Sequence, residues 1–67
     1  MNDFILVHAY GTSCEYLPTL IRISNIKSVE TRTGNSNYRA IYMKDDSYYM
    51  VKEPIEEIYK MIKENGN

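Results

Sequence analysis

The sequence predicts an α+β fold: a small, twisted antiparallel β-sheet of four to five strands with one C-terminal α-helix packed on one face. Two observations support this prediction. Up to residue 53, tyrosines lie among valine, isoleucine and threonine, a composition that favours half-buried strands. From residue 54 the apolar residues recur every three to four positions instead, which is typical of an amphipathic helix.

The expected strands are residues 4–10, 16–23, 26–33, 38–43 and 47–52. The first ends at the glycine-led segment 11–13. Pro18 lacks a backbone N–H, which confines the early part of the second strand to a sheet edge or an irregular start. Residues 24–25 interrupt the pattern briefly, and 34–37 form the clearest turn, because Gly and Asn tolerate positive φ.

The expected helix covers residues 54–64, with Pro54 suited to its first position. Its apolar stripe is spaced i, i+3, i+4 and i+7 and consists of Ile55, Ile58, Tyr59 and Ile62. A helix this short does not hold together alone in water, so the stripe must dock on the sheet. Ile58, at the centre of the stripe, is expected to be its most buried residue.

The face that the helix covers depends on the turn between the last two strands. A three-residue connection, 44–46, would place one set of side chains under the helix (Ile41, Met43, Tyr49 and Val51) and another on the opposite face (Tyr42, Tyr48 and Met50). A two-residue connection would exchange the faces of residues 48–51. We favour the longer connection because it gathers aliphatic side chains beneath the helix, with Asp46 in the left-handed position where Gly is preferred.

A chain of 67 residues is expected to form a single domain, 1–67, with a core that barely offsets its conformational entropy. One cysteine and one histidine provide neither a disulfide nor a closed zinc site, so a protein partner is the expected source of further stability. One helix covers one face of a sheet that is apolar on both. The expected interaction face consists of Leu6, Tyr38, Tyr42, Tyr48 and Met50.

This face predicts a homo-oligomer, most simply a dimer, with a heterologous protein as the other candidate partner. The net charge of −1 argues against a dedicated DNA-binding protein. The apolar run 4–7 is too short for a signal peptide or a membrane span, and one unpaired cysteine fits a reducing compartment. The expectation is a cytoplasmic protein with no membrane partner.

Catalytic chemistry has little support in the sequence, and the prediction is that the protein is not an enzyme. Cys14 and His8 could form a nucleophile–base pair, but no third group that would orient them is evident. Two adjacent aspartates, Asp45 and Asp46, are better explained as a hairpin turn than as a metal site. No phosphate-binding loop or other catalytic motif is present, so no catalytic residue, metal or cofactor is assigned.

Two stretches, IRISNIKSVE (21–30) and AIYMKDDSYYMVKEPIEEIYKMI (40–62), resemble the small flagellar protein family FlbD and similar short bacterial and phage proteins. The shared pattern is a strand, a turn with a buried Ile26, then Ser-Val-Glu (28–30), an aliphatic hairpin, and Val-Lys-Glu (51–53) opening a Glu-Glu-Ile helix (56–58). The chain departs from it at 45–46, where the family usually has Asn-Gly. The resemblance implies a small non-enzymatic accessory protein.

The leading expectation is therefore a small, non-catalytic interaction protein, an accessory or inhibitory factor of bacterial or phage origin that self-associates. The alternative is a module that binds a nucleotide or single-stranded nucleic acid at an oligomer interface, since arginines lie on strands interleaved with tyrosines on which bases can stack. The residues assigned to that alternative are Arg22, Arg32, Arg39 and Tyr42.

Overall fold

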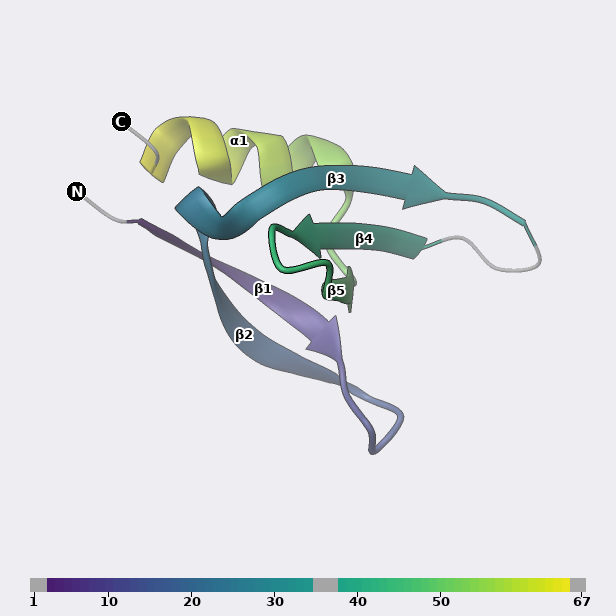
Figure 1. The fold of residues 1–67 in the computed structure, drawn as a ribbon. Helices are drawn as coiled ribbons and strands as arrows, with labels where there is room; N and C mark the ends of the chain where they lie inside the picture. Colours follow the sequence, from purple (N-terminus) through teal and green to yellow (C-terminus); the bar gives the residue numbers. More distant parts are fainter. Residues whose placement is uncertain (1–2, 35–37, 66–67) are drawn as a thin grey trace.

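The computed structural model describes residues 3–34 and 38–65, and within them the chain forms five β-strands and one α-helix (Figure 1). In chain order these are β1 (Phe4–Tyr10), β2 (Tyr16–Arg22), the short 3₁₀ turn η1 (Ile23–Asn25), β3 (Ile26–Arg32), β4 (Tyr38–Met43), β5 (Tyr48–Val51) and α1 (Ile55–Asn65). The predicted α+β class is confirmed. Of the predicted turn 34–37, residues 35–37 lie outside the described residues.

The strands form one antiparallel sheet in the order β2-β1-β5-β4-β3. Three neighbouring pairs join strands that follow one another in the chain, whereas β1 and β5 meet through a single pair among the described residues, Ala9 with Val51. Because this contact, the seam between β1 and β5, is so short, the β1–β2 hairpin can lie at an angle to the β3–β4–β5 strands. Figure 1 shows β1 and β2 crossing below these strands at an angle.

The turn between β4 and β5 has the longer of the two predicted lengths. The Met43 N–H donates to the Ser47 carbonyl at 2.8 Å, which leaves three residues, 44–46, in the connection. Asp46 adopts φ 73°, the left-handed conformation expected at this position. The resulting register pairs Tyr42 with Tyr48 and Ile41 with Tyr49, and it decides which side chains lie under the helix.

The core lies between the sheet and α1. It consists of Ile5, Val7 and Ala9 from β1, Ile21 from β2, Ile41 and Met43 from β4, Val51 from β5 and Ile58 from α1. Ile58 is 0% exposed and is the buried residue of α1, so the prediction for the centre of the apolar stripe is confirmed. The helix begins where the Pro54 carbonyl accepts hydrogen bonds from the Glu57 and Ile58 N–H groups.

Glu53 and Arg39 hold the link between β5 and α1 in place. Beyond Ala9–Val51 the Lys52 N–H still donates to the His8 carbonyl at 2.9 Å, and the Glu53 carboxylate then accepts the His8 backbone N–H at 2.9 Å in place of a neighbouring strand. Arg39 donates from Nε to the Glu53 carbonyl at 2.9 Å and from its terminal nitrogen to the Lys52 carbonyl. The link therefore has satisfied backbone groups although it lies outside the sheet.

Among residues 3–34 and 38–65, no helix has the length and apolar character needed to cross a membrane.

Candidate interaction surface

The sheet has a helix-free face, built by every second residue of each strand. Along β1 the residues on this face alternate with buried ones, and the same alternation continues across the sheet. Several large apolar side chains here remain in contact with solvent: Phe4, Leu6, Tyr10, Tyr16, Leu20 and Tyr48. A surface of this composition, in strands that carry an aliphatic core on their other side, is typical of a protein interface.

An aromatic band crosses the helix-free face, and we define it by Tyr16, Tyr10, Met50, Tyr48 and Tyr42. Tyr10 and Tyr16 meet edge to face with ring centroids 5.3 Å apart, and Tyr42 and Tyr48 lie 5.8 Å apart. The pairing of Ala9 with Val51 sets Tyr10 opposite Met50, which joins the two tyrosine pairs. Tyrosine suits such a surface because its ring is apolar while its hydroxyl remains hydrated.

A small residue lies beside the band. Ala40 is 0% exposed although it belongs to the helix-free face, where it pairs with Met50 and lies two positions from Tyr38 and from Tyr42 along β4. Its methyl group is therefore not part of the exposed surface.

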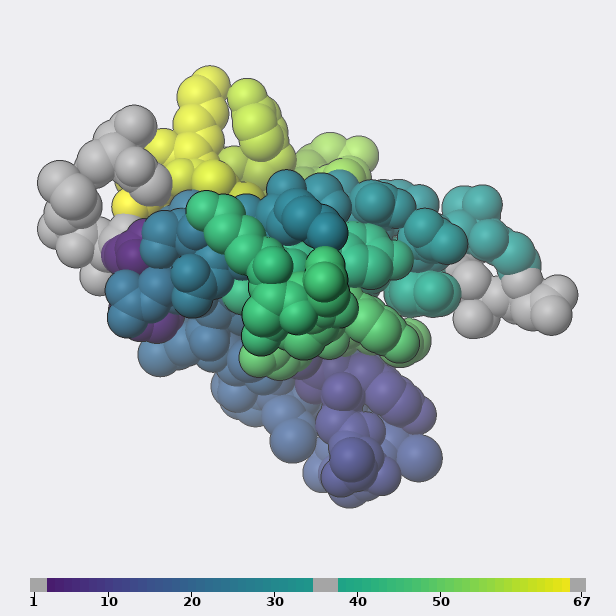
Figure 2. All heavy atoms as spheres, viewed as in Figure 1, coloured from purple at the N-terminus to yellow at the C-terminus, as the bar shows by residue number. Residues whose placement is uncertain are grey.

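An aliphatic cluster on the β1–β2 hairpin, Phe4, Leu6 and Leu20, forms a second part of the helix-free face. Leu6 pairs with Leu20, which is 66% exposed, and Phe4 pairs with Arg22. The Arg22 guanidinium lies 4.7 Å from the centroid of the Phe4 ring. In Figure 2 the β1–β2 hairpin projects from the body of the molecule at the bottom of the view, apart from the end of β3 (teal) at the right.

The structure brings together most of the predicted interaction face and sets one member apart. Tyr42, Tyr48 and Met50 lie side by side on β4 and β5, and Tyr38 lies on the same face of β4, beyond Ala40. Leu6 belongs to the aliphatic cluster instead, because β1 and β5 separate beyond Ala9. Sequence reasoning missed Tyr10 and Tyr16 as members of the band. Their period-two alternation was visible, but the sequence does not show that β1 lies next to β5.

The residues assigned to the alternative ligand site are dispersed. Arg22 and Arg32 lie at the end of β2 and the end of β3, separated by the length of β3, roughly 20 Å at about 3.3 Å per residue. Each is paired locally, Arg22 with Asp3 at 3.1 Å and Arg32 with Glu30 at 3.0 Å. Arg39 holds the β5–α1 link, while Tyr42 belongs to the aromatic band. The four side chains do not converge on one ligand.

His8 and Glu53 form a close polar pair at the seam between β1 and the β5–α1 link. His8 Nδ1 lies 2.7 Å from Glu53 Oε2, and the Glu53 side chain is 10% exposed. Burial by itself would raise the pKa of Glu53, but the hydrogen bonds from the backbone N–H and side chain of His8 outweigh it, so the pKa lies below the ordinary value. The pair thus stabilises the ionised carboxylate. The hydrogen-bond partner of the His8 ring is Glu53, whereas a nucleophile–base pair would require Cys14 in that place.

Cys14 lies in the loop between β1 and β2, exposed and with φ 61°. A backbone hydrogen bond from Gly11 N–H to the Glu15 carbonyl at 2.8 Å closes this loop. The hydrogen bond between the Cys14 side chain and the Tyr10 hydroxyl, together with slight burial and the neighbouring Tyr16, raises the pKa of Tyr10. Cys14 therefore contacts one end of the aromatic band.

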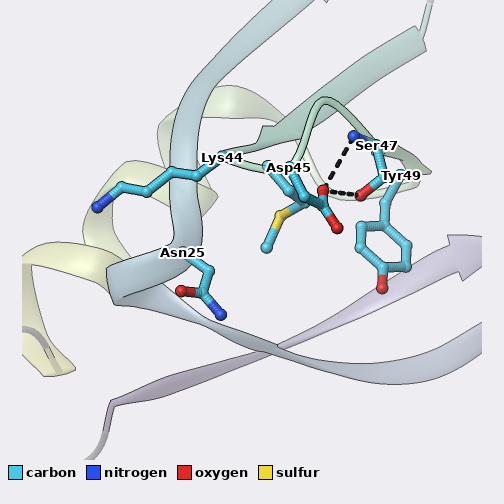
Figure 3. A pocket seen from close by; sticks show the side chains of 6 residues that line it. Asn25, Lys44, Asp45, Ser47 and Tyr49 are labelled. Atoms are coloured by element: carbon cyan, nitrogen blue, oxygen red, sulfur yellow. Dashed lines mark hydrogen bonds between the residues drawn. The ribbon is translucent and has the colours of Figure 1, made fainter.

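An open hollow of about 370 Å³ lies beside the β4–β5 turn and is lined by Asn25, Met43, Lys44, Asp45, Ser47 and Tyr49 (Figure 3). Its carboxylate is already engaged: Asp45 Oδ1 accepts the Ser47 N–H at 3.0 Å and the Ser47 hydroxyl at 2.5 Å. Bonding to that hydroxyl and N–H lowers the pKa of Asp45. Lys44 extends away from Ser47 and Tyr49 in Figure 3, so the polar groups do not point at a common centre.

The two turn aspartates serve the hairpin, as the sequence predicted. Asp46 pairs with Lys27 at 3.2 Å, which ties the β4–β5 turn to β3. Across residues 3–34 and 38–65, His, Cys, Asp and Glu side chains form no group of three or more that could hold a metal ion.

No protein-family model, curated protein or solved structure matches the chain.

Proposed function

We propose that the protein is a small, non-catalytic interaction protein, acting as an accessory or inhibitory factor, and that it self-associates by burying its helix-free face against the same face of a second copy. The observation that carries this proposal is the aromatic band together with the aliphatic cluster. Both lie on a face that α1 does not cover, and Tyr48, at the start of β5, is 56% exposed.

The size of the surface leaves room for such a contact. The chain exposes 4842 Å². A standard protein interface takes about 800 Å² from each partner, roughly a sixth of this surface.

The composition of the face suits reversible association. The band is rich in tyrosine, a residue enriched at interfaces because it contributes a large apolar area with few rotatable bonds. Pairing about a two-fold axis brings each patch against its own copy, which is the commonest arrangement among soluble oligomers. Tyrosine rings of one copy would then pack against the aromatic band of the other.

The test compares two adjacent tyrosines on opposite faces. Tyr48→Glu places a carboxylate in the aromatic band. Burial of an unpaired charge there would cost roughly several kcal/mol, so the variant should show a lower mass by light scattering. Tyr49→Glu is the matched control, because Tyr49 is also exposed but lines the hollow on the other face. It should leave the mass unchanged.

A wild-type mass of one 7.9 kDa chain at micromolar concentration would refute self-association. An equal loss of mass in both variants would show that the helix-free face is not the interface.

A further inference from the structure

The two edges of the sheet differ in how they expose their backbone amides. In the β1–β2 hairpin, the bond from Gly11 N–H to the Glu15 carbonyl fixes the alternation. The even-numbered residues of β2, Tyr16 to Arg22, therefore direct their backbone N–H groups away from β1 toward the open side. Pro18 occupies one of these positions and has no N–H. A proline in this place blunts an edge against pairing with another chain.

The opposite edge, β3, has no proline, and its register shift between Ile26 and Ser28 lies before Val29. The bond from Met43 N–H to the Ser47 carbonyl shows that Met43 and Ile41 bond toward β5. Tyr42 and Ala40 therefore bond toward β3, where they pair with Ser28 and Glu30. The N–H and carbonyl groups of Val29 and Thr31 consequently point out of the sheet, along an edge without proline (Figure 1).

The space beside this edge is apolar. A groove of about 190 Å³ separates β3 from α1 and is lined by Val29, Ile55, Ile58, Tyr59 and Ile62. Tyr59 is 66% exposed although it belongs to the apolar stripe of the helix. An unpaired strand next to an apolar groove is the arrangement that accepts an added strand, since the backbone supplies hydrogen bonds and the groove accepts side chains.

We propose that the added strand is β3 of a second copy, paired antiparallel with Thr31 opposite Thr31. The charges of β3 favour this occupant. On the helix-free side, Glu30 and Arg32 flank Thr31, so the register sets Glu30 opposite Arg32 of the second copy and Arg32 opposite its Glu30. The two side chains already pair within one chain at 3.0 Å. Both are about half exposed, so neither has to leave a buried position before it contacts the second copy.

On the face of β3 toward α1, the same register sets Thr33 of the second copy opposite Val29, at the apolar groove. The two-fold axis repeats this contact between Thr33 of the first copy and Val29 of the second. The outward N–H and carbonyl of Thr31 then bond reciprocally with those of the second copy. Two five-stranded sheets become one continuous sheet with both helices on the same side.

This inference deepens the proposed self-association, on which it rests, by adding a second and separate contact. Edge pairing through β3 leaves the aromatic band free, so two such ten-stranded sheets can stack through their helix-free faces. Two independent two-fold contacts that close give a tetramer with three mutually perpendicular axes. The expected assembly contains four chains.

The decisive experiment mixes two charge variants. Glu30→Arg gives a chain with two basic residues around Thr31, and Arg32→Glu gives one with two acidic residues. Each variant alone sets like charges opposite each other twice and should weaken edge pairing roughly tenfold or more, so the mass by light scattering falls from four chains to two. An equimolar mixture sets opposite charges together again and should restore four. Wild-type mass in each separate variant would overturn the proposal.

A backbone variant tests the same edge without charge. Thr31→Pro removes an outward N–H but no bond to β4, so the fold should persist by circular dichroism while edge pairing is lost. Thr31→Ala keeps the N–H and should retain the wild-type mass. Combining Thr31→Pro with Tyr48→Glu separates the two contacts: the double variant should be a single chain, whereas each single variant should be a dimer. If Thr31→Pro leaves the mass unchanged while Tyr48→Glu lowers it, the edge inference is wrong and the proposed function stands.

Discussion

The two faces of the sheet arise from the same strands but are built from different kinds of residue. The face under α1 is aliphatic, with isoleucine and valine at its centre, and those side chains are almost fully buried. The helix-free face is largely aromatic, and its tyrosines retain contact with water. Alternation along a strand explains that there are two faces, but it does not explain their different chemistry.

Under the proposed self-association, the difference reflects when each face becomes buried. Aliphatic side chains gain nothing from water, so they fit a face that is covered as the chain folds. Tyrosine can be exposed in the free chain, because its hydroxyl is hydrated, and can still bury a large ring upon association. The covered face thus holds the fold together, and in the proposed function the helix-free face binds a second copy.

The largest expected effect is on the covered face. Ile58→Ala removes the fully buried centre of the helix stripe and should lower the free energy of unfolding by about 2–5 kcal/mol, comparable to the whole stability of a small domain. Urea denaturation followed by circular dichroism measures it. Tyr59→Ala is the control on the same helix and should shift the midpoint little, because Tyr59 is exposed. An unchanged midpoint for Ile58→Ala would mean that the helix does not dock.

A smaller effect is expected at Glu53, which lies at the rim between the faces. Glu53→Ala leaves the His8 backbone N–H without its acceptor and should lower the free energy of unfolding by about 1–3 kcal/mol. Glu53→Gln keeps an oxygen at that position and should lose less. Urea midpoints of the three proteins at neutral pH provide the comparison, and equal losses in the two variants would argue against the backbone acceptor role.

The same carboxylate should make stability depend on pH. The pKa of Glu53 is below its ordinary value in the folded chain, so the folded state favours the ionised form. Its contribution is complete above the ordinary Glu pKa of about 4.3 and is lost as the pH falls through the lower folded value. Wild-type unfolding free energy should therefore fall more steeply than that of Glu53→Gln as the pH is lowered from neutrality past that point. Parallel acid profiles would contradict this.

On the helix-free face, a substitution should change association and leave the fold intact. Tyr48→Ser removes an exposed ring and should alter the unfolding free energy of the dilute chain by no more than about 0.5 kcal/mol. It should, however, reduce the increase in melting temperature that the wild type shows as concentration rises, leaving only the part due to the β3 edge. Thermal melts over a hundredfold range of concentration distinguish the two effects. A large loss at low concentration would make Tyr48 part of the core.

The smallest effect is expected in the β1–β2 loop, where Cys14→Ser should preserve the fold and the assembly. Cys14 is exposed, and its substitution retains a small polar side chain near Tyr10. Circular dichroism and light scattering should match the wild type. Loss of association in a folded Cys14→Ser variant would give the thiol a role that the non-catalytic proposal does not include.

Much of the fold follows from local patterns in the sequence. The strands follow from alternation and from turn residues, and the helix follows from its stripe, because each of these signals is contained in ten or so neighbouring residues. The length of the β4–β5 turn was predictable as well, because only a three-residue connection places Ile41 and Val51 on the same face. That length also requires the left-handed conformation that Asp46 adopts.

The candidate surface was harder to predict because it depends on strand order. Nothing within residues 4–10 indicates that β1 lies next to β5, so the sequence could not join Tyr10 to Met50 or separate Leu6 from Tyr42. The hydrogen bonds from Arg39 to the β5–α1 link were not predictable either. The path of that link depends on how β5 contacts β1. The FlbD resemblance remains a prediction.

The seam between β1 and β5 also sets the order of events as the chain folds. The other strand pairs join neighbours in sequence and can form early, whereas the His8–Glu53 contact spans 45 residues and requires a long loop to close first. The β1–β2 hairpin can therefore dock only after β5 and α1 have been made, and on the ribosome it emerges well before them. Throughout that interval the face that α1 later covers is exposed. Pro18 blocks part of the hairpin's outer edge and so limits pairing with other unfinished chains.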